Sequence, residues 1–198
     1  AFAAAAERFG RVDILVNNAG INVPRLLVDP QDQEELDAST WDKVFAVNAR
    51  GQFLCAQAAA RGMIADGQGG VIVMINSESG MEGSEGQSVY AATKAAGYNM
   101  TRSWAKELGK QGVRVVGVAP GIMEATALRS EAYERSLAYT RGKTVEQLRE
   151  GYLNKSTIPL GRDGKLSEVA DLVCFLASPR ASYIHGTTVN ISGGKSRA

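Results

Sequence analysis

Val71-Ile-Val-Met-Ile-Asn-Ser77 is the stretch of sequence that decides the fold. An unbroken apolar run of this length is typical of a strand that is buried on both faces, as in a parallel sheet covered by helices. The run ends at a serine, and ligands of open α/β sheets bind beyond the carboxyl ends of the strands. The stretch therefore predicts a central parallel strand that delivers Ser77 to a binding cleft.

The pattern of a buried strand followed by a turn of small residues occurs twice more, at residues 12–20 and 113–121. Periodicity predicts strands near 12–17, 70–76, 113–118 and 187–191, with helices near 39–65, 88–110, 126–139, 144–153 and 166–177. Two helix starts resemble capping boxes, Ser39-Thr-Trp-Asp42 and Thr144-Val-Glu-Gln147. Strands that alternate with long helices predict an α/β fold with a doubly wound parallel sheet, Rossmann-like.

Tyr90-Ala-Ala-Thr-Lys94 lies in one predicted helix, thirteen residues beyond Ser77. A free phenol has a pKa near ~10 and is a poor base at neutral pH. Lys94, one turn beyond Tyr90 on the same face, would favour the phenolate by at most about 4 kcal/mol. Ser77 would hold the reacting oxygen while Tyr90 moves the proton and a nicotinamide ring exchanges hydride with the carbon. The three residues predict an enzyme that transfers hydride.

The Tyr-x-x-x-Lys spacing is weak evidence by itself, because Tyr139 and Lys143 repeat it. That second match contains a glycine that weakens a helix, and no apolar strand ends before it. Asn48 is a further candidate, since asparagine is not favoured inside the long apolar helix that is predicted around it. A satisfied polar residue at a helix kink is the alternative interpretation of Asn48.

The composition indicates one domain with a substantial core: 198 residues, 44% hydrophobic, with a net charge of +1. No Lys/Arg run indicates nucleic-acid binding, and no apolar segment approaches the ~20 residues that span a membrane. We expect a cytoplasmic protein. Cys55 and Cys174 lie in apolar helical stretches and are expected to be reduced core residues. With His185 as the single histidine, the sequence does not support a metal site.

The chain resembles the short-chain dehydrogenase/reductase family over nearly all of its length. The resemblance rests on Asn17-Asn-Ala-Gly20, Asn48, Ser77, Tyr90-x-x-x-Lys94, Pro120-Gly121, and the ending from Pro159-Leu-Gly-Arg162 to Gly193-Gly194. It implies that Tyr90 is the catalytic acid or base and that Ser77 orients the substrate. It implies further that Lys94 lowers the tyrosine pKa and binds the nicotinamide ribose, and that Asn48 holds a water linking the lysine to solvent.

The resemblance also implies the cofactor and the assembly. NAD is the expected cofactor, with NADP as the alternative, bound by Asn17, Asn18, Ala19, Gly20, Tyr90, Lys94, Pro120, Gly121, Ile122 and Thr126. A homotetramer is expected, formed in part by helices 39–65 and 88–110. Their small faces permit close approach, at Ala56, Ala58, Ala59, Ala60, Ala91, Ala92, Ala95 and Ala96. Packing of these alanines against the chain's own sheet is the alternative.

The family's amino-terminal Gly-rich turn is absent from this sequence. The first residues, Ala1-Phe-Ala-Ala-Ala-Ala-Glu-Arg-Phe9, resemble the end of the helix before the family's fourth strand. We therefore expect a first βαβ portion of roughly sixty to seventy residues to precede Ala1. Residues 1–198 would then form a single domain without its dinucleotide fingerprint. Residues 124–165, inserted before the last helix and strand, are polar enough for a mobile lid over the substrate.

Four runs lie where substrate is expected: 24–29, 77–87, 120–124 and 144–151. They resemble family members that act on a sugar-alcohol phosphate, and imply NAD-linked oxidation of sorbitol 6-phosphate to fructose 6-phosphate and its reverse. Glycines 80, 83 and 86 predict a substrate-side loop after Glu78, or else a flexible spacer. The phosphate needs a basic anchor outside the catalytic set. The candidates are Arg25 and, among the lid residues Arg129, Arg141, Lys143, Lys155 and Arg162, chiefly Arg141.

Two other functions stay open at this point. The first is a reductase of the same family for another carbonyl, such as a 3-oxoacyl thioester or a sugar acid. The second is a truncated, non-catalytic family member that serves as a binding or oligomerisation module. Assays on each substrate would separate the first from the polyol phosphate reaction.

Overall fold

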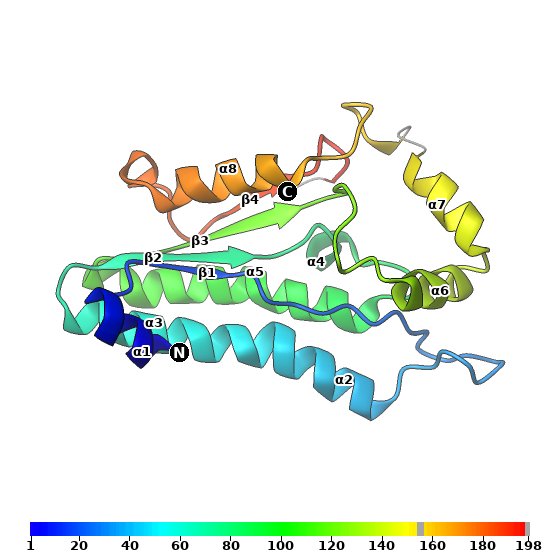
Figure 1. The fold of residues 1–198 in the computed structure, drawn as a ribbon, viewed down its shortest axis with the longest axis horizontal. Coiled ribbons are helices and arrows are strands. Elements are labelled where there is room, and N and C mark those ends of the chain that lie inside the picture. Colours follow the sequence, from blue (N-terminus) through cyan, green and yellow to red (C-terminus); the bar gives the residue numbers. More distant parts are fainter. Residues whose placement is uncertain (154–156, 197–198) are drawn as a thin grey trace.

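A parallel sheet forms the centre of the molecule (Figure 1). The computed structural model describes residues 1–153 and 157–196. Within them the sheet has the strand order β1-β2-β3-β4, formed by β1 (Ile14–Asn17), β2 (Gly70–Ile75), β3 (Val113–Pro120) and β4 (Thr188–Ile191). Each strand pairs in parallel with the next strand of the sequence. The predicted α/β fold with a parallel sheet is confirmed.

Helices connect these strands and cover both faces of the sheet (Figure 1). They are α1 (Phe2–Phe9), α2 (Ala38–Phe45), α3 (Gln52–Ala65), α4 (Ser79–Glu82), α5 (Ser88–Leu108), α6 (Glu131–Thr140), α7 (Val145–Leu153) and α8 (Leu166–Ala177). A π-helical segment, η1 (Ala46–Gly51), joins α2 to α3, so the predicted helix 39–65 is helical throughout but is not one α-helix.

The two faces of β2 explain why its sequence is apolar at every position. Ile72 and Met74 pack against Met63 of α3, in a core that α5 also joins. Val73 points the other way and packs against Leu176 of α8. Successive side chains of a strand lie on opposite faces, so a strand covered on both sides needs apolar residues throughout.

One of the two predicted capping boxes is wrong. The start of α2 is capped by Asp37, whose Oδ1 accepts a hydrogen bond from the Thr40 amide at 2.7 Å. Ser39 does not cap, because its hydroxyl donates to Asp37 at 2.6 Å. The box at α7 is confirmed: the Thr144 amide donates to Gln147 Oε1 at 2.9 Å, and the Gln147 amide donates to Thr144 Oγ1 at 3.2 Å.

The helix predicted over 126–139 begins later, at Glu131. Ser130 is its N-cap and accepts a hydrogen bond from the Tyr133 amide at 3.2 Å. Before it, the Thr126 hydroxyl accepts from the Leu128 amide at 3.3 Å. Threonine side chains offer such local bonds as an alternative to the helix, and this keeps residues 126–129 in a turn.

Helices α6 and α7 extend away from the sheet at the right of Figure 1. They share a small core of their own, with Leu137 and Leu148 buried between them. Tyr139, from the second Tyr-x-x-x-Lys match, donates its hydroxyl hydrogen bond to Asp29 at 2.9 Å. Backbone amides, chiefly that of Glu34, and this phenol hold the pKa of Asp29 at about 2. The predicted lid, residues 124–165, is thus tied through α6 to the loop around Asp29. Its residues 154–156 lie outside the described part.

Two glycines in long helices differ in what surrounds them. A Cβ at Gly97 of α5 would lie 2.2 Å from Asn76 Oδ1, whereas a Cβ at Gly62 of α3 would meet nothing within 4 Å. We expect Gly97→Ala to lower the free energy of unfolding by about 1–3 kcal/mol through overpacking. Gly62→Ala should raise it by roughly 0.5–1 kcal/mol, because alanine is the better helix former. Urea unfolding of both variants measures the difference, and effects of the same sign would contradict this account.

Candidate active site

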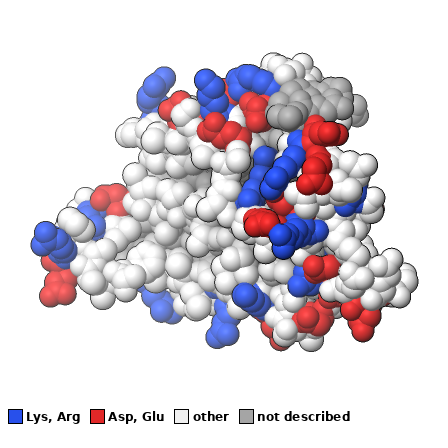
Figure 2. Space-filling view, turned by 45° about the vertical axis from the view of Figure 1, so that its right-hand side comes forward, with Lys and Arg blue, Asp and Glu red and all other residues white. Residues whose placement is uncertain are grey.

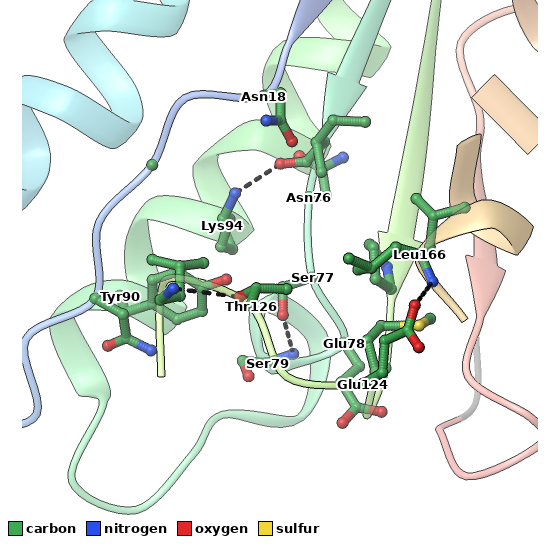
Figure 3. A pocket seen from close by; sticks show the side chains of 18 of the residues that line it. Asn18, Asn76, Ser77, Glu78, Ser79, Tyr90, Lys94, Glu124, Thr126 and Leu166 are labelled. Atoms are coloured by element: carbon green, nitrogen blue, oxygen red, sulfur yellow. Dashed lines mark hydrogen bonds between the residues drawn. The ribbon is translucent and has the colours of Figure 1, made fainter. Parts of the chain in front are cut away.

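A cavity of about 580 Å³ opens at the carboxyl ends of β1, β2 and β3 (Figure 3). This is the edge of the sheet where the strand pattern predicts a binding cleft. The volume is ordinary for a small-molecule or cofactor site, roughly 300–1,000 Å³. Its wall includes many of the predicted site residues, namely Asn18, Gly20, Ser77, Glu78, Tyr90, Lys94, Pro120, Gly121 and Thr126.

Ser77, Tyr90 and Lys94 meet on one side of this cavity (Figure 3). Ser77 follows β2, and the other two project from the first two turns of α5. The Ser77 and Tyr90 side chains are hydrogen-bonded to each other. Ser77 Oγ also accepts from the Ser79 amide at 3.2 Å, and the Tyr98 hydroxyl donates to the Ser77 carbonyl at 3.2 Å. These bonds fix the serine hydroxyl beside the phenol.

Burial, rather than Lys94, sets the ionisation of Tyr90. Desolvation raises the pKa of the phenol, and the hydrogen bond with Ser77 offsets only part of that rise. The Lys94 ammonium lies 5.6 Å from the centre of the Tyr90 ring and donates to the Ile75 carbonyl at 2.6 Å. The expected lowering of the Tyr90 pKa by Lys94 is wrong for this arrangement, because the ammonium is bonded to backbone. Burial in turn lowers the pKa of Lys94 to about 8.

Asn48 is fully buried in the π-helical segment η1. Its Oδ1 accepts from the Ile21 amide at 2.8 Å, and its Nδ2 donates to the Ile21 carbonyl at 2.8 Å and to Thr93 Oγ1 at 3.2 Å. The amide therefore ties the turn after β1 to α5. It is a satisfied polar residue at a helix irregularity, and π segments of this kind are frequent at functional sites. A water held by Asn48 stays a prediction.

Glycines bring backbone close to the reacting groups at two turns. A Cβ at Gly20 would lie 3.5 Å from Asn48 Oδ1 and 3.8 Å from Lys94 Nζ. A Cβ at Gly121 would lie 2.7 Å from Ser192 Cβ and 2.9 Å from Glu78 Oε2. A side chain at Gly121 would clash, whereas one at Gly20 would make ordinary contacts, and at both positions the cavity wall is backbone.

Three residues predicted to bind the cofactor do not line this cavity. Asn17 is buried beneath it, where Nδ2 donates to the Gln52 carbonyl at 3.0 Å and to Met74 Sδ at 3.3 Å. The alternation of side chains explains this, because Asn17 and Asn18 point to opposite sides. Ala19 is absent from the wall, and Ile122 faces a neighbouring pocket.

The two predicted phosphate anchors have different surroundings. Arg25 forms an ion pair with Glu34, donates to the Pro24 carbonyl at 2.7 Å, and lines neither pocket. Because Glu34 already pairs with its guanidinium, we do not carry Arg25 forward as the anchor. Arg141 lines a smaller pocket of about 260 Å³ that adjoins the cavity. Lys155, another basic residue of the lid, lies outside the described residues.

The structure also adds residues that the sequence did not single out. Gln87 and Tyr133 line both pockets, and the Gln87 amide donates to the Tyr133 hydroxyl at 2.6 Å. Gln87 precedes Tyr90 by about one helical turn, a spacing that could have identified it. Lys195 comes from the other end of the chain, and no local pattern in the sequence indicates its role.

The prediction of Cys174 as a core residue is wrong: it is exposed, since its side of α8 faces the cavity, and Cys55 is only partly buried.

Comparison with known proteins agrees with the fold and with an oxidoreductase. Residues 1–196 match the family described as Enoyl-(Acyl carrier protein) reductase. The chain belongs to the short-chain dehydrogenase/reductase family, whose members are oxidoreductases that use nicotinamide cofactors. It is 61% identical to the Sorbitol-6-phosphate 2-dehydrogenase of Klebsiella pneumoniae over 194 residues, which are 96% of this chain and 72% of the relative.

Two solved structures show the same fold. One is a Sorbitol-6-Phosphate 2-dehydrogenase from Erwinia amylovora, with a TM-score of 0.84 and 31% identity, covering 99% of this chain and 73% of that chain. The other is a 3-ketoacyl-(acyl-carrier-protein) reductase from Brucella melitensis complexed with NADH, with a TM-score of 0.79 and 28% identity, covering 98% and 72%. In the part of the chain that the structure describes, no helix is long and apolar enough to cross a membrane.

Proposed function

We propose that this oxidoreductase interconverts sorbitol 6-phosphate and fructose 6-phosphate with NAD as its cofactor. The observation that carries the reaction type is the meeting of Ser77, Tyr90 and Lys94 on one wall of the cavity. The 61% identity to the Klebsiella relative supports the substrate. The Erwinia neighbour, which has the same name, supports it further.

Glu78 supports a substrate with many hydroxyl groups. It follows Ser77, lines both pockets, and is 9% exposed. Its Oε1 accepts from the Lys195 ammonium at 2.9 Å, but its Oε2 has no hydrogen-bond partner among the described residues. A buried acceptor without a donor is costly, and a polyol hydroxyl would supply the missing donor. An acyl thioester would not.

The cavity fits the nicotinamide end of the cofactor. Backbone at Gly20 and Gly121 leaves room for a flat ring, because a Cβ at Gly20 would approach Asn48 and Lys94 and a Cβ at Gly121 would clash with Ser192. Asn18, Pro120 and Thr126 on the same wall would hold the ring, and the carboxyl ends of parallel strands are where such ligands bind. The cofactor accepts or supplies the hydride when it is bound.

The chain's own residues would manage the proton. The Ser77 hydroxyl holds the substrate oxygen beside Tyr90. Because burial raises its pKa, the phenol is protonated at neutral pH and can give its proton to a ketone oxygen during reduction. Oxidation needs the phenolate, which takes the proton of the alcohol. Lys94, with a pKa of about 8, lies behind Tyr90 and would contact the ribose of the cofactor.

A substrate panel tests this function. The full-length natural protein would be assayed in the reducing direction with fructose 6-phosphate, a 3-oxoacyl thioester and a keto sugar acid, each with NADH and with NADPH. We expect kcat/KM to be highest for fructose 6-phosphate with NADH, by at least roughly 100-fold, a difference of about 2.7 kcal/mol in the barrier. A preference for the thioester would instead favour the activity for which the Brucella neighbour is named. Turnover of none would support a non-catalytic member.

We also propose a cytoplasmic homotetramer. The alanine argument for the assembly is partly wrong, because Ala56, Ala59 and Ala60 pack into the chain's own core. Larger residues on the outer side of α3 and α5 are better candidates for an interface. Phe53 is 41% exposed and Ile64 is 38% exposed, and together with Trp104 they line a shallow groove.

Replacement of one residue of this outer surface tests the assembly. For the full-length protein at micromolar concentration, we expect light scattering to give the molar mass of a tetramer. Phe53→Glu should reduce that mass to a dimer or monomer, because a charge would be buried between chains. A parent protein that is monomeric under these conditions would contradict the tetramer.

A further inference from the structure

The smaller pocket beside the active site is lined by charged and polar side chains that could bind a ligand. It has a volume of about 260 Å³ and adjoins the main cavity, since seven residues line both: Glu78, Ser79, Gln87, Gly121, Met123, Arg129 and Tyr133. A molecule whose reacting carbon lies at Ser77 and Tyr90 could extend past Gln87 and Tyr133 into this space. Figure 2 shows basic and acidic side chains interspersed beside the hollow on this side of the molecule.

Some of the charged side chains in the smaller pocket form ion pairs with one another, and two arginines do not. Among its described lining residues, Lys195 is the partner of the acids: its ammonium lies 2.9 Å from Glu78 Oε1 and 3.6 Å from Glu82 Oε2. Arg129 and Arg141 also line the pocket, and neither guanidinium has a carboxylate partner within residues 1–153 and 157–196. Neither guanidinium is therefore paired with a carboxylate of the described residues, and the pocket lining as a whole has three cations against two carboxylates.

Each guanidinium is held in place while some of its N–H groups stay available. Arg129 Nη2 donates to the Met123 carbonyl at 2.7 Å, and its guanidinium lies 4.1 Å from the centre of the Tyr152 ring. Arg141 Nη2 donates to Ser84 Oγ at 3.2 Å. A guanidinium carries five N–H donors, so both arginines have donors left for a ligand. Both also act on the phenol of Tyr133, whose pKa they lower against the larger effect of burial.

We propose that Arg129 and Arg141 bind the phosphate of the substrate in this smaller pocket, while Glu78 accepts a hydrogen bond from one of the substrate's hydroxyls. This assignment rests on the proposed function, and it names the part of the site that selects phosphorylated polyols. A phosphate dianion matches two arginines in charge, and the planar fork of each can donate two parallel hydrogen bonds to its oxygens. The Tyr133 hydroxyl and Ser84 lie on the same wall and complete its set of polar groups.

Steady-state kinetics of the full-length protein tests the assignment. For Arg129→Gln and for Arg141→Gln, we expect KM for sorbitol 6-phosphate to rise at least roughly tenfold, with kcat within about threefold and no change in KM for free sorbitol. Arg141→Lys should recover part of the loss, because it keeps the charge and loses the fork. Arg135→Gln is the matched control, since Arg135 lies on α6 but pairs with Glu131 at the surface, and it should change neither constant.

Calorimetry separates this proposal from the proposed function. Fructose 6-phosphate should bind the parent at least roughly tenfold more tightly than it binds either arginine variant, while fructose binds all of them equally. If this pattern is found without turnover, the phosphate subsite stands and the proposed reaction fails. If fructose 6-phosphate is turned over but both arginine variants bind it like the parent, the reaction stands and the subsite is overturned. Equal losses for the phosphorylated and free sugars would also overturn it.

Discussion

Tyr90→Phe is expected to reduce turnover at least about 100-fold, because general acid-base catalysis contributes roughly 10²–10⁴-fold and the Tyr90 phenol bonds the Ser77 side chain, whereas the Tyr98 phenol bonds the Ser77 carbonyl. The substitution removes one hydroxyl and no volume. Ser77 keeps its bond from the Ser79 amide, so the melting temperature should hardly change. The measurement is kcat for sorbitol 6-phosphate together with thermal unfolding.

The second Tyr-x-x-x-Lys match supplies a matched control. Tyr139→Phe removes a hydroxyl that is bonded to Asp29, on the loop around that residue and away from the cavity. It should keep kcat within about threefold of the parent while lowering the free energy of unfolding, because the bond to Asp29 is lost. If Tyr90→Phe also stayed within threefold, the phenol would not be the proton donor.

Lys94→Met is expected to have the second largest effect, a loss of at least about 100-fold in kcat/KM with little loss of stability. A buried ammonium with a pKa of about 8, compared with 10.5 in its ordinary state, is destabilised by on the order of 3 kcal/mol. Methionine removes this cost and also one hydrogen bond to Ile75, worth roughly 1 kcal/mol. The free energy of unfolding at pH 7 should therefore stay equal to the parent's or exceed it.

The pH dependence of stability checks the same group. Between pH 8 and about 10 the unfolded lysine holds its proton while the folded one has lost it, so this residue makes stability rise with pH in that window. The slope of stability against pH in urea unfolding should be smaller for Lys94→Met than for the parent. A variant destabilised by several kcal/mol at pH 7 would show that Lys94 supports the fold, contrary to this account.

The parallel sheet and the meeting of Ser77, Tyr90 and Lys94 could be predicted from the sequence, because both depend on local patterns. The apolar run from Val71 to Ile75 needs cover on both faces, and this alone predicts a central strand. Ser77 follows that strand, and Tyr90 and Lys94 share one helix, so their meeting requires only that the helix return along the sheet. The cavity at the strand ends follows from the same topology.

The partners of the charged side chains could not be predicted from the sequence, because they depend on contacts between distant segments. The Lys94 ammonium bonds the Ile75 carbonyl rather than serving the phenol, and no spacing in the sequence indicates that choice. Arg25 and Arg141 look alike as basic loop residues, but Glu34 neutralises the first and no described carboxylate pairs with the second. Lys195 reaches Glu78 from the other end of the chain. Such partners are set by tertiary packing and not by local pattern.

The most direct test of the central claim is the oxidation of sorbitol 6-phosphate by the full-length natural protein with NAD. Formation of NADH would be followed by its absorbance, and the sugar product identified by nuclear magnetic resonance. The account predicts that NADH and fructose 6-phosphate form in equal amounts, and that Tyr90→Phe removes at least about 99% of the rate. No NADH from sorbitol 6-phosphate, together with rapid turnover of a 3-oxoacyl thioester, would contradict it.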